Sequence, residues 1–260
     1  MRVRLMTFNI AHGRGLGLYQ GFTSNRKLRS NLRRIADLIT AMEVDIVALQ
    51  EVDEDSSWNH KINLLEEIGQ YCALDHLVMG VHTRRTGRFR LNYGNALISR
   101  LPVSAHQTYA FGTRTVGEKG FLLADLETED GRILPILNLH LDFRSRARRL
   151  AQVAQIIDCV ESLHARGPEL LPIVCGDFNV GSHRSRDATA ELFRYLNVRH
   201  QYSLHPNGQR TFPAQWPQRT LDFIFVPEVY EVVRVEVVRS FLSDHRPVVA
   251  EIRLPSRAPS

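Results

Sequence analysis

Short apolar segments recur along the chain with the spacing of strands. Residues 3–10 alternate between polar and apolar positions and end just before a glycine-rich loop, which favours a strand. Residues 45–53 form a continuous apolar run that ends in polar residues, which is typical of a strand buried on both faces. The same reasoning predicts further strands at residues 95–99, 121–126, 133–140, 171–175, 221–226 and 248–252.

Helical spacing of apolar residues separates several of these strands. Residues 24–42 carry an apolar row with Ser24 as a candidate N-cap, residues 145–163 carry a second row, and residues 61–70 carry a shorter one. Strands interleaved with helices and with hairpin-like strand pairs indicate an α/β (α+β) chain with mixed rather than purely parallel sheets. We expect one domain over residues 1–254 and a frayed tail over residues 255–260.

Composition narrows the class of protein. The 260 residues are 43% hydrophobic and 23% charged, which excludes a disordered or fibrous chain. The N-terminal segment lacks a long apolar stretch, and no apolar hairpin suited to membranes is evident, so we expect a cytoplasmic protein without integral membrane association. The three cysteines have no CxxC spacing, which favours reduced packing residues.

The basic charge points to a phosphate-bearing partner. The net charge is +5, which would help to recruit a phosphoester substrate, and a nucleic acid is one candidate. Only Lys27, Lys61 and Lys119 among the 33 basic residues are lysines, so a coding bias explains the arginines equally well. No feature of the sequence points to a protein partner.

Polar and titratable residues lie at the ends of many predicted strands. They are Asn9, Glu51, His140, Asp177, Asn179, Asp222, Asp244 and His245. Strand ends in α/β proteins hold loop-borne groups around one cleft, and Gly176 would let the backbone turn before Asp177. Each residue alone could be a turn former or a cap, but their joint occurrence favours a site.

The residue types favour metal-assisted phosphoester hydrolysis. Glu51, Asp177 and Asp244, with two asparagines, supply oxygen ligands that suit Mg²⁺ or Mn²⁺. His140 and His245 titrate near neutrality and can donate hydrogen bonds to a phosphoryl oxygen. Acyl transfer would instead require an activated serine or cysteine.

Eight segments in order resemble the endonuclease/exonuclease/phosphatase superfamily. They are TFNI, LQEVD, YGNALISR, NLHLD, GDFN, TFP, LDFIFV and SDHRPV, and they span residues 7–248. The resemblance implies a DNase I-like four-layer αββα sandwich, in which helices flank two mixed β-sheets. It also implies a Mg²⁺-dependent phosphoesterase whose metal ligand is Glu51, with Asn9 beside it and Asp244 contributing.

The resemblance also implies roles for the other residues. Asp177 would orient or deprotonate the attacking water, and Asn179 would hold water or the phosphate. His245 would contact the scissile phosphate in the tautomer fixed by Asp222. His140 would stabilise the developing charge or protonate the leaving oxygen, but residues 82–95 offer no acidic partner for it.

The substrate stays open at this stage. Substrate-binding candidates are Asn95, Arg149, Tyr93 and Trp216, and a basic groove could use Arg84, Arg85, Arg88, Arg90, Arg184 and Arg186. A solvated charge run explains those arginines at least as well. We expect a phosphodiesterase or nuclease; the alternatives are a phosphatase or phospholipase-type hydrolase and a non-catalytic phosphate-binding module.

Overall fold

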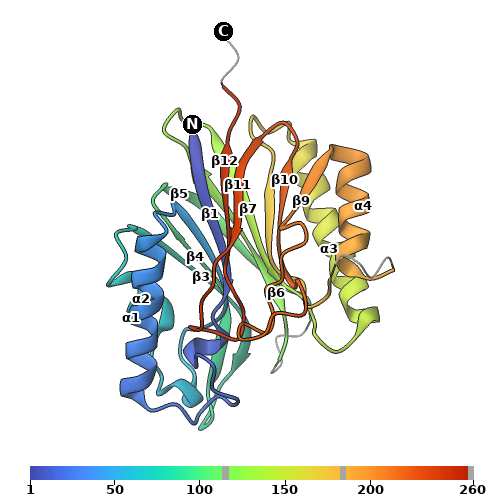
Figure 1. Cartoon of the computed structure of the whole chain (residues 1–260). Coiled ribbons are helices and arrows are strands. Elements are labelled where there is room, and N and C mark those ends of the chain that lie inside the picture. Colours follow the sequence, from blue (N-terminus) through green and yellow to red (C-terminus); the bar gives the residue numbers. More distant parts are fainter. Residues whose placement is uncertain (113–116, 182–185, 257–260) are drawn as a thin grey trace.

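Two six-stranded mixed sheets pack face to face in the computed structural model, which describes residues 1–112, 117–181 and 186–256 (Figure 1). The first sheet has the order β11 (Glu231–Val237), β12 (Val248–Arg253), β1 (Arg2–Asn9), β2 (Ile46–Asp53), β4 (Leu91–Ser99) and β3 (His76–Arg85). The second has the order β5 (Val103–Ala110), β6 (Gly120–Glu127), β7 (Ile133–His140), β8 (Ile173–Asp177), β10 (Asp222–Pro227) and β9 (Tyr202–His205). The predicted αββα sandwich is confirmed.

Helices cover the outer face of each sheet (Figure 1). Helices α1 (Asn25–Ala41) and α2 (Leu64–Gly69) pack on the first sheet, and α3 (Arg146–Ala165) and α4 (Ala188–His200) pack on the second. Helix α1 begins after Ser24, as predicted, because the Ser24 side chain accepts a hydrogen bond from the Lys27 backbone N–H. Among the described residues, none of these helices is both long and apolar enough to cross a bilayer.

Strands in the middle of each sheet are apolar on both faces. In β1, Val3 and Leu5 point into the core between the sheets, whereas Met6 and Phe8 pack under helices α1 and α2. Burial on both sides produces the continuous apolar runs that predicted these strands.

The strands that the sequence did not predict are the edge strands β3, β5, β9 and β11. An edge strand has one face or one side in solvent, so its apolar pattern is weak; most of the side chains in β5 are exposed or half-buried. Helix α4 was also missed. The helix predicted over residues 61–70 begins only at Leu64, because the Asn63 side chain caps it by accepting from the Leu65 and Glu66 backbone N–H groups.

The topology brings the carboxyl ends of the central strands together. Strands β1 and β2 are parallel in one sheet, and β7 and β8 are parallel in the other. The register places His140 beside Asp177 and Asp222 opposite Asp177. Gly176 has a φ of +142°, and a Cβ there would lie 2.0 Å from the Leu139 carbonyl oxygen, so only glycine fits this close pairing. The polar residues at these strand ends therefore share one end of the sandwich.

Candidate active site

Asp177 lies at the centre of the cluster and is almost fully buried. Its Oδ2 accepts a hydrogen bond of 2.9 Å from Asn9 Nδ2, and its Oδ1 accepts one of 2.8 Å from the Asn179 backbone N–H. Burial raises the pKa of Asp177, and nearby Asp222 raises it further, although His245 acts in the opposite direction. Asp177 is thus a fixed carboxyl group with increased proton affinity.

His245 and Asp222 form a buried pair next to Asp177. His245 Nδ1 donates to Asp222 at 2.9 Å, so this hydrogen bond fixes the orientation of the ring. The other nitrogen, Nε2, lies 3.7 Å from Asp177 Oδ2. Burial opposes charge on the ring, but Asp222 and Asp177 outweigh it and raise the pKa of His245 to about 10. His245 can therefore donate a proton or a hydrogen bond from Nε2.

His140 has a lysine partner instead of the acidic partner that the sequence lacked. Lys119 Nζ lies 3.3 Å from His140 Nδ1, and an ammonium group can only donate, so Nδ1 must accept. The proton of the neutral ring is then on Nε2, which lies 3.4 Å from Asp177 Oδ2. Burial and the neighbouring Lys119 charge lower the pKa of His140 well below its usual value. His140 is accordingly a neutral hydrogen-bond donor toward the centre of the site.

Glu51 projects into the site from a distorted part of β2. The pairing of β2 with β4 is irregular between Leu49 and Val52, and Glu51 has a φ of +56°, which is rare for a residue with a side chain. Its carboxylate lies 3.4 Å from Lys119 Nζ and 3.8 Å from His140 Nε2. Burial alone would raise the pKa of Glu51, but Lys119, His12 and His140 lower it well below its usual range. Glu51 is therefore ionised and available to a cation.

His12 supports Glu51 from the other side. Its Nδ1 donates to Asp53 Oδ2 at 2.8 Å, and its Nε2 lies 3.5 Å from Glu51 Oε2. Asp53 in turn accepts hydrogen bonds from Trp58 Nε1 and Asn59 Nδ2. The glycine-rich loop after the first strand thus carries a buried histidine that lies beside a site carboxylate.

Sequence reasoning missed both Lys119 and His12. Lys119 is one of three lysines in the chain and lies two residues before the predicted strand at residues 121–126. That position near a strand end was the one signal in the sequence that could have identified it. His12 follows Asn9 by three residues and has a φ of +54°, which a sequence does not reveal. Their contacts join segments far apart in the chain, so only the fold could show them.

Asp244 and Asn179 have partners of their own. Asp244 Oδ2 accepts from Arg14 Nη2 at 2.7 Å, which neutralises the carboxylate that the resemblance offered as a further ligand. Asn179 Nδ2 donates to the Leu141 carbonyl at 2.9 Å, so its amide is held beside Asp177. Neither residue shows a contact with Glu51.

The four substrate-binding candidates differ in accessibility. Asn95 is fully buried, and its Nδ2 donates to the Gly120 and Asn138 carbonyls of the other sheet. Arg149 is buried in a two-pronged ion pair with Asp187. The polar atoms of both residues bind the protein itself, and their predicted roles in substrate binding stay untested.

Of the other two candidates, Tyr93 is buried and Trp216 is exposed. Tyr93 lies against His12 with its ring edge-on, and its hydroxyl accepts from the Gly117 backbone N–H. Trp216 is 80% exposed on the loop before β10. Both stay predictions.

The predicted basic groove is partly paired. Arg84 and Arg90 form ion pairs with Glu54 and Asp55, and Arg184 lies outside the described residues. These pairs favour a solvated surface for this stretch over a continuous phosphate track.

The donor set fits a hard divalent cation. Glu51 supplies carboxylate oxygens, and Asn9 Oδ1, which accepts one hydrogen bond from the Ala11 N–H, keeps a second lone pair. Asp177, Asp222 and His245 also place ligand atoms within 4.8 Å of one another and could hold a metal ion. In that trio, however, Asp222 and His245 already bind each other, whereas the charge of Glu51 is balanced only by nearby cationic and imidazole groups. The predicted cation site at Glu51 and Asn9 stays a prediction.

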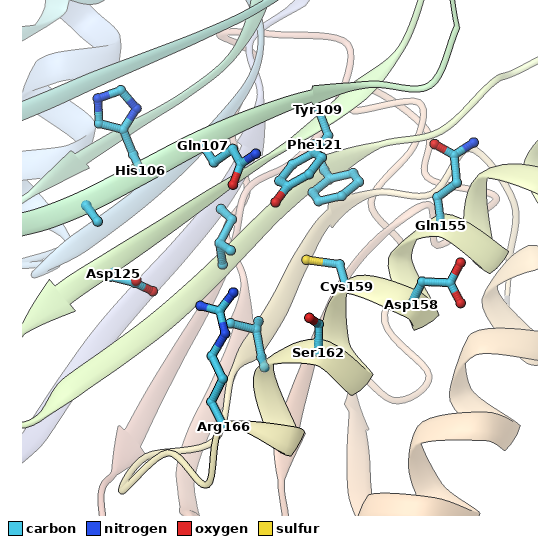
Figure 2. Close-up of a pocket in the computed structure, with 13 residues that line it drawn as sticks. His106, Gln107, Tyr109, Phe121, Asp125, Gln155, Asp158, Cys159, Ser162 and Arg166 are labelled. Atoms are coloured by element: carbon cyan, nitrogen blue, oxygen red, sulfur yellow. The ribbon is translucent and has the colours of Figure 1, made fainter.

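A separate pocket of about 510 Å³ lies between strands β5 and β6 and helix α3 (Figure 2). Tyr109 stacks on Phe121 at its floor, and Arg166 and Asp125 face it from different elements. None of the strand-end residues described above lines this pocket. This pocket is therefore separate from the cluster of polar residues at the strand ends.

A family model and a curated relative match most of this chain. Residues 6–245 match the model of the Endonuclease/Exonuclease/phosphatase family. The uncharacterized protein YbhP of Escherichia coli K12 is 26% identical, and the match covers 92% of this chain and 94% of YbhP.

Two solved structures show the same fold. An endonuclease/exonuclease/phosphatase from Bacteroides vulgatus superposes with a TM-score of 0.74 at 19% identity, over 98% of this chain and 100% of that chain. The mannosyl-6-phosphatase Bt3783 of Bacteroides thetaiotaomicron superposes with a TM-score of 0.73 at 16% identity, over 96% and 99%. With a family match over almost its whole length and these shared folds, the chain belongs to the endonuclease/exonuclease/phosphatase family.

Proposed function

We propose that the protein is a Mg²⁺-dependent phosphodiesterase that cleaves a P–O bond by attack of water. The observation that carries this proposal is a chain of close contacts across the two sheets. Glu51 lies 3.8 Å from His140, His140 lies 3.4 Å from Asp177, and Asp177 lies 3.7 Å from His245. Carboxylates that can accept a proton and imidazoles that can donate hydrogen bonds are the groups that phosphoester hydrolysis needs.

Asp177 would act as the base. Its increased proton affinity suits a carboxylate that accepts a proton from water while the new P–O bond forms. Asn9 and the Asn179 backbone N–H hold the carboxylate, so little reorganisation is needed during the reaction. The leaving oxygen departs opposite the water as the old P–O bond breaks.

The two histidines would act on the phosphoryl oxygens. His245, held by Asp222, donates from Nε2, and its raised pKa keeps a proton available for the charge that develops on the phosphate. His140 donates from its neutral Nε2, with Lys119 supplying the nearby positive charge. Between the two roles that the resemblance implied for His140, this geometry favours charge stabilisation over protonation of the leaving oxygen.

Mg²⁺ or Mn²⁺ held by Glu51 and Asn9 would supply Lewis acidity toward a phosphoryl oxygen. Three neighbouring side chains stabilise the ionised form of Glu51. They are His12, Lys119 and His140, which lie within 3.8 Å of its carboxylate. A cytoplasmic location stays a prediction.

There are two alternative functions: hydrolysis of a different class of phosphoester, and binding of phosphate without catalysis. The fold shared with a mannosyl-6-phosphatase keeps a phosphatase as the second candidate. A non-catalytic phosphate-binding module is less well supported, since the base, the paired histidine and the cation ligand are all in place.

We expect Lys119→Met to lower kcat by about 10²-fold, because it removes a positive charge from the water-poor site where the phosphate would react. The variant should also change the tautomer of His140, since Nδ1 loses its donor. Nitrogen-15 NMR of the histidine rings reports that change directly, and Lys61→Met on the surface serves as the control. An unchanged tautomer together with full activity would contradict the assignment.

The function is tested by hydrolysis of bis(p-nitrophenyl) phosphate and p-nitrophenyl phosphate with and without EDTA. We expect Mg²⁺-dependent cleavage of the diester, silenced by EDTA and restored by excess Mg²⁺ or Mn²⁺. Faster cleavage of the monoester would favour the phosphatase. Diester cleavage that is indifferent to chelation would refute the metal-dependent mechanism.

A further inference from the structure

Large apolar side chains are exposed on several loops at the end of the sandwich that holds the candidate active site. We call these eight residues the apolar rim: Leu16, Leu18, Tyr19, Phe22, Phe89, Phe143, Trp216 and Phe241. The most exposed are Leu18 at 84%, Phe22 at 87% and Trp216 at 80%. Exposed apolar residues that occur singly need no explanation, but a group of them on one side of a protein marks a contact surface.

The apolar rim comes from five loops that all lie at the catalytic end. These loops comprise residues 10–24, 86–90, 141–145, 206–221 and 238–247. Four of them adjoin or contain a site residue, and the loop of residues 86–90 joins β3 to β4. In Figure 1 this is the lower end of the sandwich, away from the N-terminus. Among the described residues, the loops at the opposite end expose large apolar side chains only at Tyr71 and Val229.

Basic and acidic residues are also distributed unevenly between the two ends of the sandwich. The five rim loops hold eight arginines and two acidic residues, Asp142, which is buried, and Asp244, which pairs with Arg14. Loops at the opposite end hold the reverse balance, with three arginines and seven acidic residues: Glu43, Asp45, Asp75, Glu129, Asp130, Glu169 and Glu228. The five rim loops are therefore basic as well as apolar, although Arg90 pairs with Asp55 of a neighbouring loop.

Arginines and apolar side chains alternate at close range on this surface. The Arg144 guanidinium lies 4.8 Å from the centre of the Phe143 ring, and the Arg239 guanidinium lies 5.7 Å from the Phe241 ring. Phe89 stands between Arg88 and Arg90 in sequence. Apolar groups that enter the acyl boundary, beside cations that meet the headgroups, are the elements of an interfacial membrane-binding surface.

An anionic lipid surface suits the apolar rim better than a single-stranded nucleic acid does. Bases stack on aromatic planes, but Leu16 and Leu18 are aliphatic, and Leu18 is among the most exposed side chains of the group. The rim residues also come from five separate loops instead of from one continuous segment of the chain. The sequence did not indicate this surface, because its apolar residues do not form a continuous run. Gly17 separates Leu16 from Leu18, and Gln20 and Gly21 separate Tyr19 from Phe22.

We propose that the apolar rim docks the protein on an anionic membrane surface, with the active site facing the headgroups. The docking itself follows from exposure and charge. That a lipid phosphoester is then the substrate rests on the proposed function, and it would give the catalytic residues access to a P–O bond in the plane of the headgroups.

The test is co-sedimentation of the full chain with vesicles in EDTA, so that binding is measured apart from hydrolysis. We expect binding to mixed phosphatidylglycerol/phosphatidylcholine vesicles and little binding to phosphatidylcholine alone. The double substitution Leu18→Ser and Phe22→Ser should weaken binding by at least about tenfold. The matched control, Val198→Ser with Val229→Ser, removes two other exposed apolar side chains away from the rim and should bind like the parent protein.

Hydrolysis of bis(p-nitrophenyl) phosphate by the rim double variant should be unchanged, because these side chains do not reach the catalytic groups. Equal vesicle binding by the rim variant and the control would overturn the docking proposal. Rim-dependent binding of a single-stranded oligonucleotide without vesicle binding would overturn it in favour of a nucleic-acid surface. Vesicle binding without hydrolysis of any phosphoester would uphold docking and refute the proposed function alone.

Discussion

Asp177→Asn is expected to lower kcat for a phosphodiester by about 10³-fold or more, because an amide cannot accept the proton of the attacking water. The change is nearly isosteric, and the Asn179 N–H can still donate to the remaining carbonyl oxygen. KM should change little, since the lost interaction acts mainly in the transition state. Steady-state kinetics on bis(p-nitrophenyl) phosphate measure both quantities.

A matched control for Asp177→Asn is Asp125→Asn in strand β6. Asp125 is half-buried in the same sheet but lines the separate pocket of Figure 2. We expect this control to keep full activity. If Asp177→Asn retains activity while its folded structure is intact, Asp177 is not the base.

Glu51→Gln is the second substitution with a large expected effect. Glutamine removes the anionic ligand, so we expect Mn²⁺ affinity to fall by at least about 100-fold, beyond the effect typical of outer-shell partners. Activity at fixed Mg²⁺ should fall by about 10³-fold, in proportion to the Lewis-acid stabilisation that is lost. Isothermal titration with Mn²⁺ measures the affinity without relying on turnover.

The control for Glu51→Gln is Glu54→Gln, three residues later in the chain and paired with Arg84 at the surface. It should bind Mn²⁺ like the parent protein. Unaltered Mn²⁺ affinity in Glu51→Gln would move the cation to another set of ligands, and the trio Asp177, Asp222 and His245 would be the first to examine.

The central strands could be predicted from sequence because they are buried on both faces. Residues 45–53 and 133–140 correspond to β2 and β7 within one residue at each end. The edge strands β3, β5, β9 and β11 could not be predicted, since solvent on one side allows polar residues such as those of β5. For the strands, the sequence pattern therefore followed burial, whereas the helices α1 and α3 were predicted from the spacing of their apolar residues.

The candidate site was predicted where polar residues follow buried strands. His140 and Asp177 lie side by side in the register, as their positions at two strand ends suggested. Lys119 and His12 were missed because their importance comes from contacts across the two sheets and through a left-handed turn. Such contacts depend on topology, which a linear pattern of apolar positions does not specify.

The central claim is that a divalent cation binds at Glu51 beside the base Asp177. A crystal structure of the protein with Mn²⁺, with the ion located by its anomalous scattering, tests that claim most directly. We expect an anomalous peak within about 2.5 Å of a Glu51 carboxylate oxygen. A peak among Asp177, Asp222 and His245 with Glu51 empty, or no peak at the strand ends, would contradict the account.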